Sequence, residues 1–289
     1  MTSLIGLKKI SIIGMGLMGG SLGKAVMNYY PDAIVTGVVR REEMLGLVLD
    51  ARAAHKSTMD IEIGVKDADL VVLSLPVEVI CKIGSEIKPY LKSGAVMTDM
   101  GSTKGKIVKT LTDVVGDGAV FIGSHPMAGS EKTGLDNSKH DLFKDATCIL
   151  TPLESTDTQL LNKLKFFWEK IGCRLMVMTP QEHDAQVAAI SHLPHIVSAG
   201  IVSVANELNK QTKTVFDLIG TGFKDCTRIA AGSPDIWLDI CVSNKKHICE
   251  QIKIFQNKIE DFREALIKED TDTVMKFLTE AKEIRENIF

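Results

Sequence analysis

The segment GSHPMAGSEKTG, residues 123–134, places a single imidazole, that of His125, between small residues and a proline. It follows the short apolar run 119–122, which has the length of a strand. Imidazole is the side chain that most readily takes up or releases a proton near neutral pH. A proline-framed loop can hold the ring in one orientation, as a general base requires. The alternative is a tight turn with a solvated histidine, so the residues near His125 in the fold decide between the two.

Small residues also close two other apolar runs. One run ends in Ser74, Leu75 and Pro76, and the next is followed by Gly101 and Ser102. If these runs are parallel strands, their carboxyl ends lie along one edge of the sheet, where such sheets bind their ligands. The sequence therefore predicts that these residues and the histidine loop form one site.

A glycine-rich turn near the amino terminus points to a ligand for that site. Gly14, Gly16 and Gly19 form G-x-G-x-x-G, with Leu17 and Met18 between the last two glycines. Glycines at this spacing, between a strand and a helix, let backbone N–H groups and the helix N-terminus approach a pyrophosphate. The alternative is a turn whose glycines serve helix packing alone. The position of the turn after the first apolar run favours a dinucleotide.

The pattern of apolar runs predicts the fold that positions these residues. Strand-length runs alternate with stretches that can be helical, as in a parallel sheet covered on both faces. The runs are 8–14, 33–39, 69–76, 95–101 and 119–124, and a helix over 158–172 with a strand over 173–178 is expected to extend the same sheet. We therefore expect an α/β fold that begins with a Rossmann-type doubly wound domain over residues 1–179.

A second, all-helical domain is expected over residues 180–289. Thr179, Pro180 and Glu182 form a capping box with proline in the first helical turn, which marks a helix start. Farther on, apolar residues at alternating spacings of four and three predict one long helix, at positions 248, 252, 255, 259, 262 and 266. This apolar seam predicts a homodimer held by the helical domains; an internal bundle helix is the alternative.

The helical domain also carries candidates for substrate binding. Ser191 and His195 are four residues apart, hence on one helical face, and Pro194 is expected to kink the helix there. Arg228 follows a glycine-containing turn, and its guanidinium fork suits a carboxylate. Trp237 lies nine residues farther on. The alternatives are a core histidine and a surface arginine, and His192 fits the core role better than His195 does.

Composition excludes several classes of function. The 289 residues are 45% hydrophobic and 25% charged, with a net charge of -3 and no block of basic residues, so we expect neither a nucleic-acid binder nor disorder. No apolar run reaches the roughly 18 residues of a membrane span, and the first residues lack the order of a signal peptide. The six cysteines have no zinc-ligand spacing, so neither a metal site nor disulfides are expected. We expect a cytoplasmic protein.

Five segments, in the same order and at similar spacing, resemble the prephenate and arogenate dehydrogenases of tyrosine biosynthesis. They are GMGLMGGSLGKAV, DMGSTKGKIV, GSHPMAGSEKTG, SHLPHIV and GFKDCTRIAAGSPDIW. The resemblance covers nearly the whole chain and implies oxidative decarboxylation, with hydride transfer from the hydroxyl-bearing ring carbon to a nicotinamide. Neither the regulatory domain nor the chorismate mutase domain that some relatives carry is expected here.

The resemblance also implies roles for individual residues. His125 corresponds to the catalytic histidine, and Ser102 to a serine that hydrogen-bonds the same substrate hydroxyl and the histidine. Arg228 matches the arginine that binds the ring carboxylate, while His195, with Ser191 and Trp237, lines the substrate pocket. Because His195 can donate to a second carboxylate, we favour prephenate over arogenate as the substrate.

Two rival interpretations remain at this point. The β-hydroxyacid dehydrogenases are similar in the glycine turn and in having a helical second domain, but they use a catalytic lysine and a different serine-glycine loop. A dinucleotide-sensing protein without catalysis keeps the glycine turn and has no use for His125, Ser102 and Arg228 together.

The end of the second strand bears on the choice of cofactor. An acidic residue there accepts hydrogen bonds from the ribose and repels a 2′-phosphate, whereas arginine accommodates the phosphate. Val39 stands at that position and is followed by Arg40 and Arg41, so we favour NADP. NAD is the alternative, because the acids at 42 and 43 can fold back toward the ribose.

Overall fold

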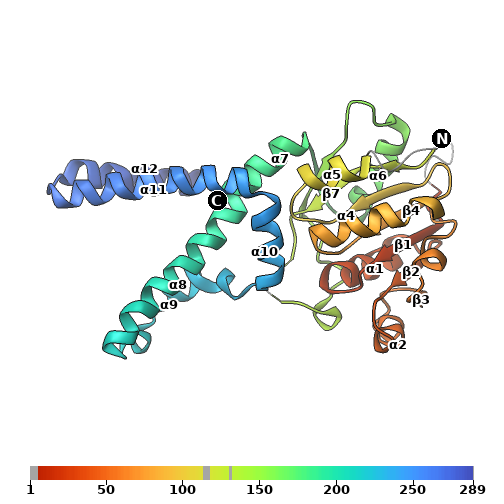
Figure 1. Ribbon diagram of the computed structural model, residues 1–289, viewed down its shortest axis with the longest axis horizontal. Coiled ribbons are helices and arrows are strands. Elements are labelled where there is room, and N and C mark those ends of the chain that lie inside the picture. The colour runs from red at the N-terminus through yellow and green to blue at the C-terminus, as the bar shows by residue number, and fades with distance from the viewer. Residues whose placement is uncertain (1–5, 113–117, 130–131, 289) are drawn as a thin grey trace.

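A computed structural model describes residues 6–112, 118–129 and 132–288 of the chain. Its first half contains a six-stranded, fully parallel sheet (Figure 1). The strands lie in the order β3-β2-β1-β4-β5-β6, and they are β1 (Lys9–Ile13), β2 (Ile34–Val38), β3 (Lys56–Thr58), β4 (Leu70–Leu73), β5 (Val96–Asp99) and β6 (Val120–Phe121). This order, with its reversal beside β1, is that of a doubly wound dinucleotide-binding sheet. The prediction of a Rossmann-type sheet is confirmed.

Helices cover both faces of this sheet. One face packs against α1 (Leu17–Tyr29), α2 (Glu43–Asp50) and α6 (Thr158–Ile171). The other face packs against α3 (Ile61–Val65), α4 (Val77–Glu86) and α5 (Gly105–Thr112). Because the strands other than the edge strand β3 are largely buried on both sides, they read in the sequence as mostly apolar runs.

The expectation that residues 173–178 extend this sheet is wrong. The strand β9 (Arg174–Val177) pairs instead with β8 (Thr147–Thr151) in a separate three-stranded sheet, in which β7 (Gly123–Pro126) runs antiparallel to β8. Beyond Ile122 the chain leaves β5, because side-chain bonds replace the backbone ladder. Thr98 donates to the carbonyl of Ile122 at 2.6 Å, and Ser124 Oγ donates to the carbonyl of Asp99 at 2.7 Å. The run 119–124 is therefore two short strands.

The helical region starts with the predicted capping box. Thr179 Oγ1 accepts from the backbone N–H of Glu182, and the Glu182 carboxylate accepts from that of Thr179. The helices are α7 (Pro180–Val187), α8 (Leu193–Thr212), α9 (Thr221–Thr227), α10 (Pro234–Ser243), α11 (Lys245–Ile267) and α12 (Thr271–Ile288). A π-helical turn, Ala188–His192, joins α7 to α8 and stands where the kink at Pro194 was expected. Pro194 itself lies in the first turn of α8, two residues after this π-helical turn ends.

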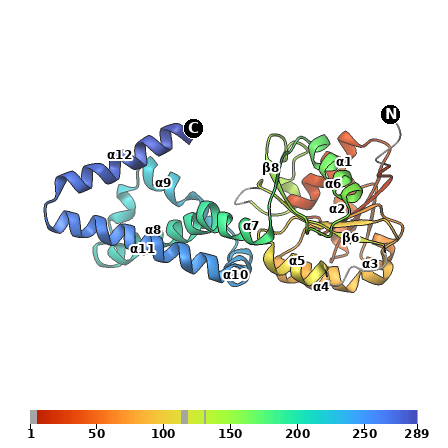
Figure 2. The same ribbon diagram turned by 90° about the horizontal axis from the view of Figure 1, so that it is seen from above.

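Helices α11 and α12 form a hairpin that extends away from the sheet (Figure 2). Phe262 and Phe277 pack across it with ring centroids 5.0 Å apart. The predicted seam lies on α11, but only Ile248 is fully buried, while Ile259 and Leu266 are 45% and 55% exposed. The described part of the single chain therefore leaves much of this apolar surface uncovered.

The continuous helical stretch Pro180–Thr212 contains a window with a mean hydropathy of 1.6, so by length and composition alone it could cross a membrane. The sequence expectation overlooked this stretch because it is not an unbroken apolar run. It carries His183, Asp184, His192 and His195, all buried in contact with the rest of the protein. Only 28% of the window is buried within one chain, so the fold of a single chain does not cover the rest of this apolar surface.

Candidate active site

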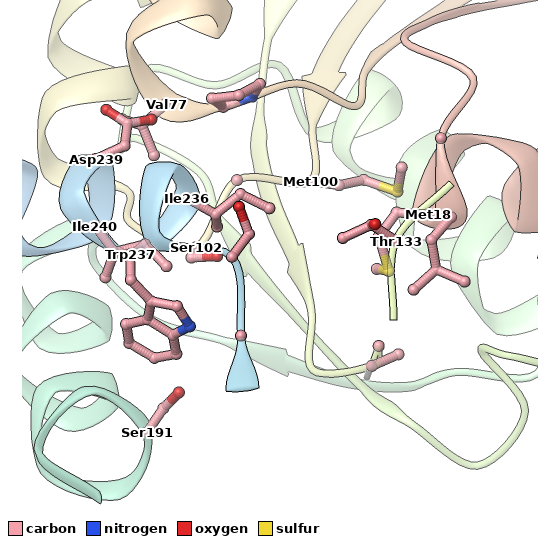
Figure 3. Close-up of a pocket in the computed structure, with 18 of the residues that line it drawn as sticks. Met18, Val77, Met100, Ser102, Thr133, Ser191, Ile236, Trp237, Asp239 and Ile240 are labelled. Atoms are coloured by element: carbon pink, nitrogen blue, oxygen red, sulfur yellow. The ribbon is translucent and has the colours of Figure 1, made fainter. Parts of the chain in front are cut away.

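A cavity of about 640 Å³ lies between the carboxyl edge of the parallel sheet and the helical region. In Figure 3, Ser191, Ser102 and the α10 residues Ile236 and Trp237 are drawn on one side of the view, and Met18, Met100 and Thr133 on the other. The predicted site residues that line the cavity are Gly16, Leu17, Met18, Ser74, Leu75, Pro76, Gly101, Ser102, His125, Ser191, His195, Arg228 and Trp237. The structure therefore brings residues from four segments of the sheet domain and from the helical region into one site.

The glycine turn forms one wall of this cavity. Gly14 has φ +94°, and a Cβ on it would lie 2.2 Å from the carbonyl oxygen of Ser74. A Cβ on Gly19 would lie 1.9 Å from the carbonyl oxygen of Gly14, so the turn and α1 can pack this closely only with glycine. Gly16 is the N-cap of α1, with no side-chain cap and open space around it. The first N–H groups of α1 thus face the cavity, which fits a pyrophosphate.

Val39, Arg40 and Arg41 lie just past the end of β2 rather than in the lining of the cavity. Val39 is buried, and its N–H donates to the carbonyl of Thr58 at 2.9 Å. Arg41 Nε lies 3.2 Å from a carboxylate oxygen of Glu43, whereas Arg40 is exposed.

His125 is the half-buried imidazole of β7, and it contacts a second histidine. Its Nδ1 lies 2.8 Å from Nε2 of His183, the fourth residue of α7. His183 Nδ1 lies in turn 2.8 Å from Oδ1 of Asp184. Burial, together with the neighbouring His183 and Lys104, lowers the pKa of His125 well below its ordinary value, so the ring is neutral at neutral pH.

The Asp184 carboxylate is held by the start of α5. Its oxygens accept from the backbone N–H groups of Lys104 and Gly105 at 2.7 and 2.8 Å. Burial works against the charge of Asp184, but the bonds from His183 and from these two N–H groups prevail and lower its pKa. Asp184 is therefore ionised.

Ser102 lines the cavity without the contact that was expected of it. Within the described residues it makes no hydrogen bond with His125, whose Nδ1 is engaged by His183. Two residues after Ser102 the chain carries Lys104, which is fully buried and forms an ion pair with the fully buried Asp99. Asp99 also accepts from the N–H groups of Gly101 and Ser124, which ties the loop after β5 to the start of β7.

Three aromatic rings line the helical side of the cavity. His195 stacks on Trp237 with ring centroids 3.5 Å apart and an interplanar angle of 11°. His195 Nδ1 is buried and has no partner within the described residues. His192, also buried, has Nδ1 3.2 Å from the side-chain nitrogen of Asn244, and burial lowers its pKa to about 4. Arg228 is an exposed residue at the rim.

Sequence reasoning missed four residues of this site: His183, Asp184, His192 as a cavity residue, and Asn244. The tripeptide HDA inside a helix looks like a solvated surface, and the only local signal was the capping box that fixes where α7 begins. Ser130 and Glu131 of the histidine loop lie outside the described residues. Among the residues that are described, no cluster of histidine, cysteine or acidic side chains could hold a metal ion.

Comparison with known proteins identifies the family. The family model for the nucleotide-binding domain of prephenate dehydrogenase matches residues 22–177, and the model for its dimerization domain matches residues 179–280. The chain belongs to the prephenate dehydrogenase family. It is thus an oxidoreductase with a nicotinamide dinucleotide as its cofactor, and the two rival classes are set aside.

Individual members of the prephenate dehydrogenase family match over nearly the whole chain. A cyclohexadienyl dehydrogenase of Zymomonas mobilis is 32% identical over 96% of this chain and 95% of its own length. A prephenate dehydrogenase of Bacillus subtilis is also 32% identical, over 96% of this chain and 76% of its own length. The crystal structure of the prephenate dehydrogenase of Aquifex aeolicus, with hydroxyphenyl propionate and NAD+, has a TM-score of 0.92 at 31% identity and covers 99% of each chain.

Proposed function

We propose that this protein is a prephenate dehydrogenase, which converts prephenate to 4-hydroxyphenylpyruvate by NAD(P)-dependent oxidative decarboxylation. The observation that carries the proposal is the place of His125. Its ring lines the same cavity as the glycine turn on one side and the His195–Trp237 pair on the other. A base between a dinucleotide turn and an aromatic pocket suits the oxidation of a ring alcohol.

In the proposed reaction His125 accepts the proton of the substrate hydroxyl through Nε2, while Ser102 donates or accepts a hydrogen bond at the same oxygen. The glycine turn around Gly16 would hold the nicotinamide cofactor, which would supply the acceptor for the hydride on the carbon that bears the hydroxyl. Arg228 binds the ring carboxylate until its bond to the ring breaks and carbon dioxide leaves. The electron pair of that bond makes the ring aromatic, and His125 returns its proton to the phenolate oxygen. The net products are the phenol, carbon dioxide and the reduced cofactor.

The side chain of the substrate distinguishes prephenate, a keto acid, from arogenate, an amino acid. We assign Ser191, His195 and Trp237 to this side chain. His195 is held flat against Trp237, and its ring can donate to a carboxylate but offers no charge to an ammonium group. Prephenate is therefore the proposed substrate, with arogenate as the alternative. Initial rates on both purified substrates test the assignment; a higher kcat/KM with arogenate would reverse it.

For the cofactor we propose NADP over NAD. Val39 replaces the acid that repels a 2′-phosphate, and Arg40 is exposed next to it, whereas Arg41 is paired with Glu43. The Aquifex relative was crystallised with NAD+, so the ratio of kcat/KM for the two cofactors is the decisive measurement. Arg40→Ala is expected to lower kcat/KM for NADP and leave that for NAD unchanged, and Arg41→Ala is the matched control. A tenfold preference for NAD that Arg40→Ala does not alter would reject the assignment.

We further propose a cytoplasmic homodimer in which residues 180–289 bind substrate and form the interface, while residues 1–179 bind the cofactor. Support comes from the apolar side chains left exposed on the helical domain, among them Val204, Ile259, Leu266 and Ile284. A second copy would also cover the exposed part of the apolar stretch Pro180–Thr212.

Light scattering tests the dimer, because one chain has a mass of 31.6 kDa. The double variant Ile259→Glu and Leu266→Glu is expected to halve the measured mass. Ile63→Glu is the control, since Ile63 is 64% exposed on the sheet domain and lies outside the proposed interface. A wild-type mass near that of one chain at micromolar concentration would contradict the proposal.

A further inference from the structure

We propose that His183 and Asp184 are positioning residues that fix the tautomer of His125, so that its Nε2 always faces the substrate without a proton. The inference rests on the proposed function for its catalytic meaning, and on the hydrogen-bond geometry for its physical content. Neither residue has to touch substrate or cofactor. Both lie on α7, in the helical domain, whereas His125 lies on β7, in the sheet domain.

The positions of the protons follow from the carboxylate of Asp184, the acceptor at the end of the series His125, His183 and Asp184. An ionised carboxylate can only accept, so the contact between Asp184 Oδ1 and His183 Nδ1 requires a proton on that nitrogen. The neutral His183 ring then carries no proton on Nε2, which becomes an acceptor. The contact of His183 Nε2 with His125 Nδ1 therefore requires that His125 donates, with its proton on Nδ1. His125 Nε2 is left with a free lone pair.

This order matters because a neutral imidazole has two tautomers, and one of them cannot act as a base. If the proton were on Nε2, that nitrogen would donate toward the substrate hydroxyl and could not accept its proton. We call the two hydrogen bonds that join His125 to His183 and His183 to Asp184 the relay, and it excludes this arrangement. If their direction were reversed, the proton of His183 would lie on Nε2, and Asp184 would face an unprotonated Nδ1. The carboxylate of Asp184 would then lose its bond from the ring.

The surrounding charges support the same arrangement. His125 is faced by His183, His192 and the ammonium of Lys104, and His183 is faced by Asp184, Lys104 and Asp99. Lys104 is neutralised by Asp99, which leaves Asp184 as the unpaired carboxylate nearest the two rings. When His125 takes up the substrate proton, the Asp184 charge stabilises the imidazolium through the intervening ring.

The relay also joins the two domains. Asp184 accepts from Lys104 and Gly105 at the start of α5, and its own carbonyl accepts from Asn244 at 2.7 Å. The orientation of the base therefore depends on contact between α7 of the helical domain and the sheet domain. We infer that only the docked arrangement of the domains holds His125 in the basic tautomer.

Nitrogen NMR of the ring nitrogens tests the inference without any turnover. Histidine labelled with ¹⁵N is incorporated, and the His125 signals are assigned by their loss in His125→Asn. A protonated Nδ1 and an unprotonated Nε2 on His125 are expected in the wild type. A proton on Nε2 would overturn the inference whether or not the protein oxidises prephenate.

A pair of substitutions at His183 gives the kinetic test. The amide of His183→Asn can replace Nδ1 and reach Asp184, but it leaves no acceptor for the His125 N–H, and a buried donor without a partner favours the other tautomer. We expect kcat to fall by about tenfold to a hundredfold, with KM unchanged. The longer amide of His183→Gln places its oxygen near the former Nε2 and is expected to restore part of the lost turnover.

The outcomes separate this inference from the proposed function. If the wild type does not oxidise prephenate, the proposed function fails, and the NMR result still tests the tautomer. If the wild type is active and His183→Asn retains its kcat, the relay is overturned. Equal losses in His183→Asn and His183→Gln, with the tautomer of His125 unaltered in both, would also overturn it, because a purely structural role predicts that result.

Discussion

Replacing His125 with asparagine would remove the proposed base and keep its anchor. The asparagine amide nitrogen occupies nearly the position of the imidazole Nδ1, so it can still donate to His183 Nε2, which lies 2.8 Å from that nitrogen. The Nε2 atom, which takes the substrate proton, has no counterpart in asparagine. The glycine turn around Gly16 is not touched by the change. The variant should therefore fold, bind the cofactor and fail at proton transfer.

The expected loss is that of a general base, about two to four orders of magnitude in kcat. At about 1.4 kcal/mol for each factor of ten, this corresponds to about 3–5 kcal/mol of transition-state stabilisation. The assay is the initial rate of cofactor reduction at saturating prephenate, with the cofactor dissociation constant measured separately. His140→Asn is the control, because His140 is exposed and lies outside the cavity lining. Retention of more than about a third of the wild-type kcat in His125→Asn would refute the reasoning.

Three further predictions concern the dependence of kcat/KM on acidic pH, the arginine at the rim of the cavity, and the buried ion pair of Lys104 with Asp99. Because only neutral His125 can accept a proton and burial lowers its pKa well below 6.5, kcat/KM should stay level from neutral pH down past 6.5 and fall only in more acidic buffer; a fall centred above 6.5 would contradict this. Arg228→Ala should raise KM for prephenate steeply, and Arg228→Lys by less, since lysine keeps the charge and loses the fork; an unchanged KM with a lower melting temperature would make Arg228 a structural residue. Lys104→Met leaves Asp99 buried without its partner and should lower the free energy of unfolding in urea by about 3–5 kcal/mol. Lys106→Met, which breaks the exposed pair with Glu78, is the control and should lower the free energy of unfolding by at most about 1 kcal/mol. Similar losses in both variants would show that burial does not make the Lys104 pair more important for stability than an exposed pair.

The features that the sequence predicted are those set by local chemistry. A turn with Gly14 at positive φ and Gly19 against the carbonyl of Gly14 leaves no room for any other residue, so its pattern is visible in one short segment. The capping box at Thr179 is equally local. Strands buried on both faces must be apolar throughout, which is why five of the six parallel strands could be recognised. The sixth, β3, is a three-residue polar edge strand without such a run, and it was missed.

The features that escaped prediction depend on contacts between distant residues. Nothing in the run 119–124 shows that its first half pairs with β5 and its second half with β8. That division is made by Thr98 and Ser124, whose hydroxyls take over the bonds of the backbone ladder. In the same way, His183 is separated from His125 by 58 residues, and only the docking of α7 brings the rings together.

The capping box nevertheless links the predictable features to those that escaped prediction. By setting the first turn of α7 at Pro180, it fixes the direction in which each following side chain leaves the helix. Successive residues on a helix differ by about 100°, so the neighbours His183 and Asp184 face different partners. His183 faces the ring of His125, while Asp184 accepts from the unpaired N–H groups at the start of α5, an end of a helix that favours negative charge. A shift of α7 by one residue would separate both contacts, so the signal that starts the helix also determines the protonation of the proposed catalytic histidine.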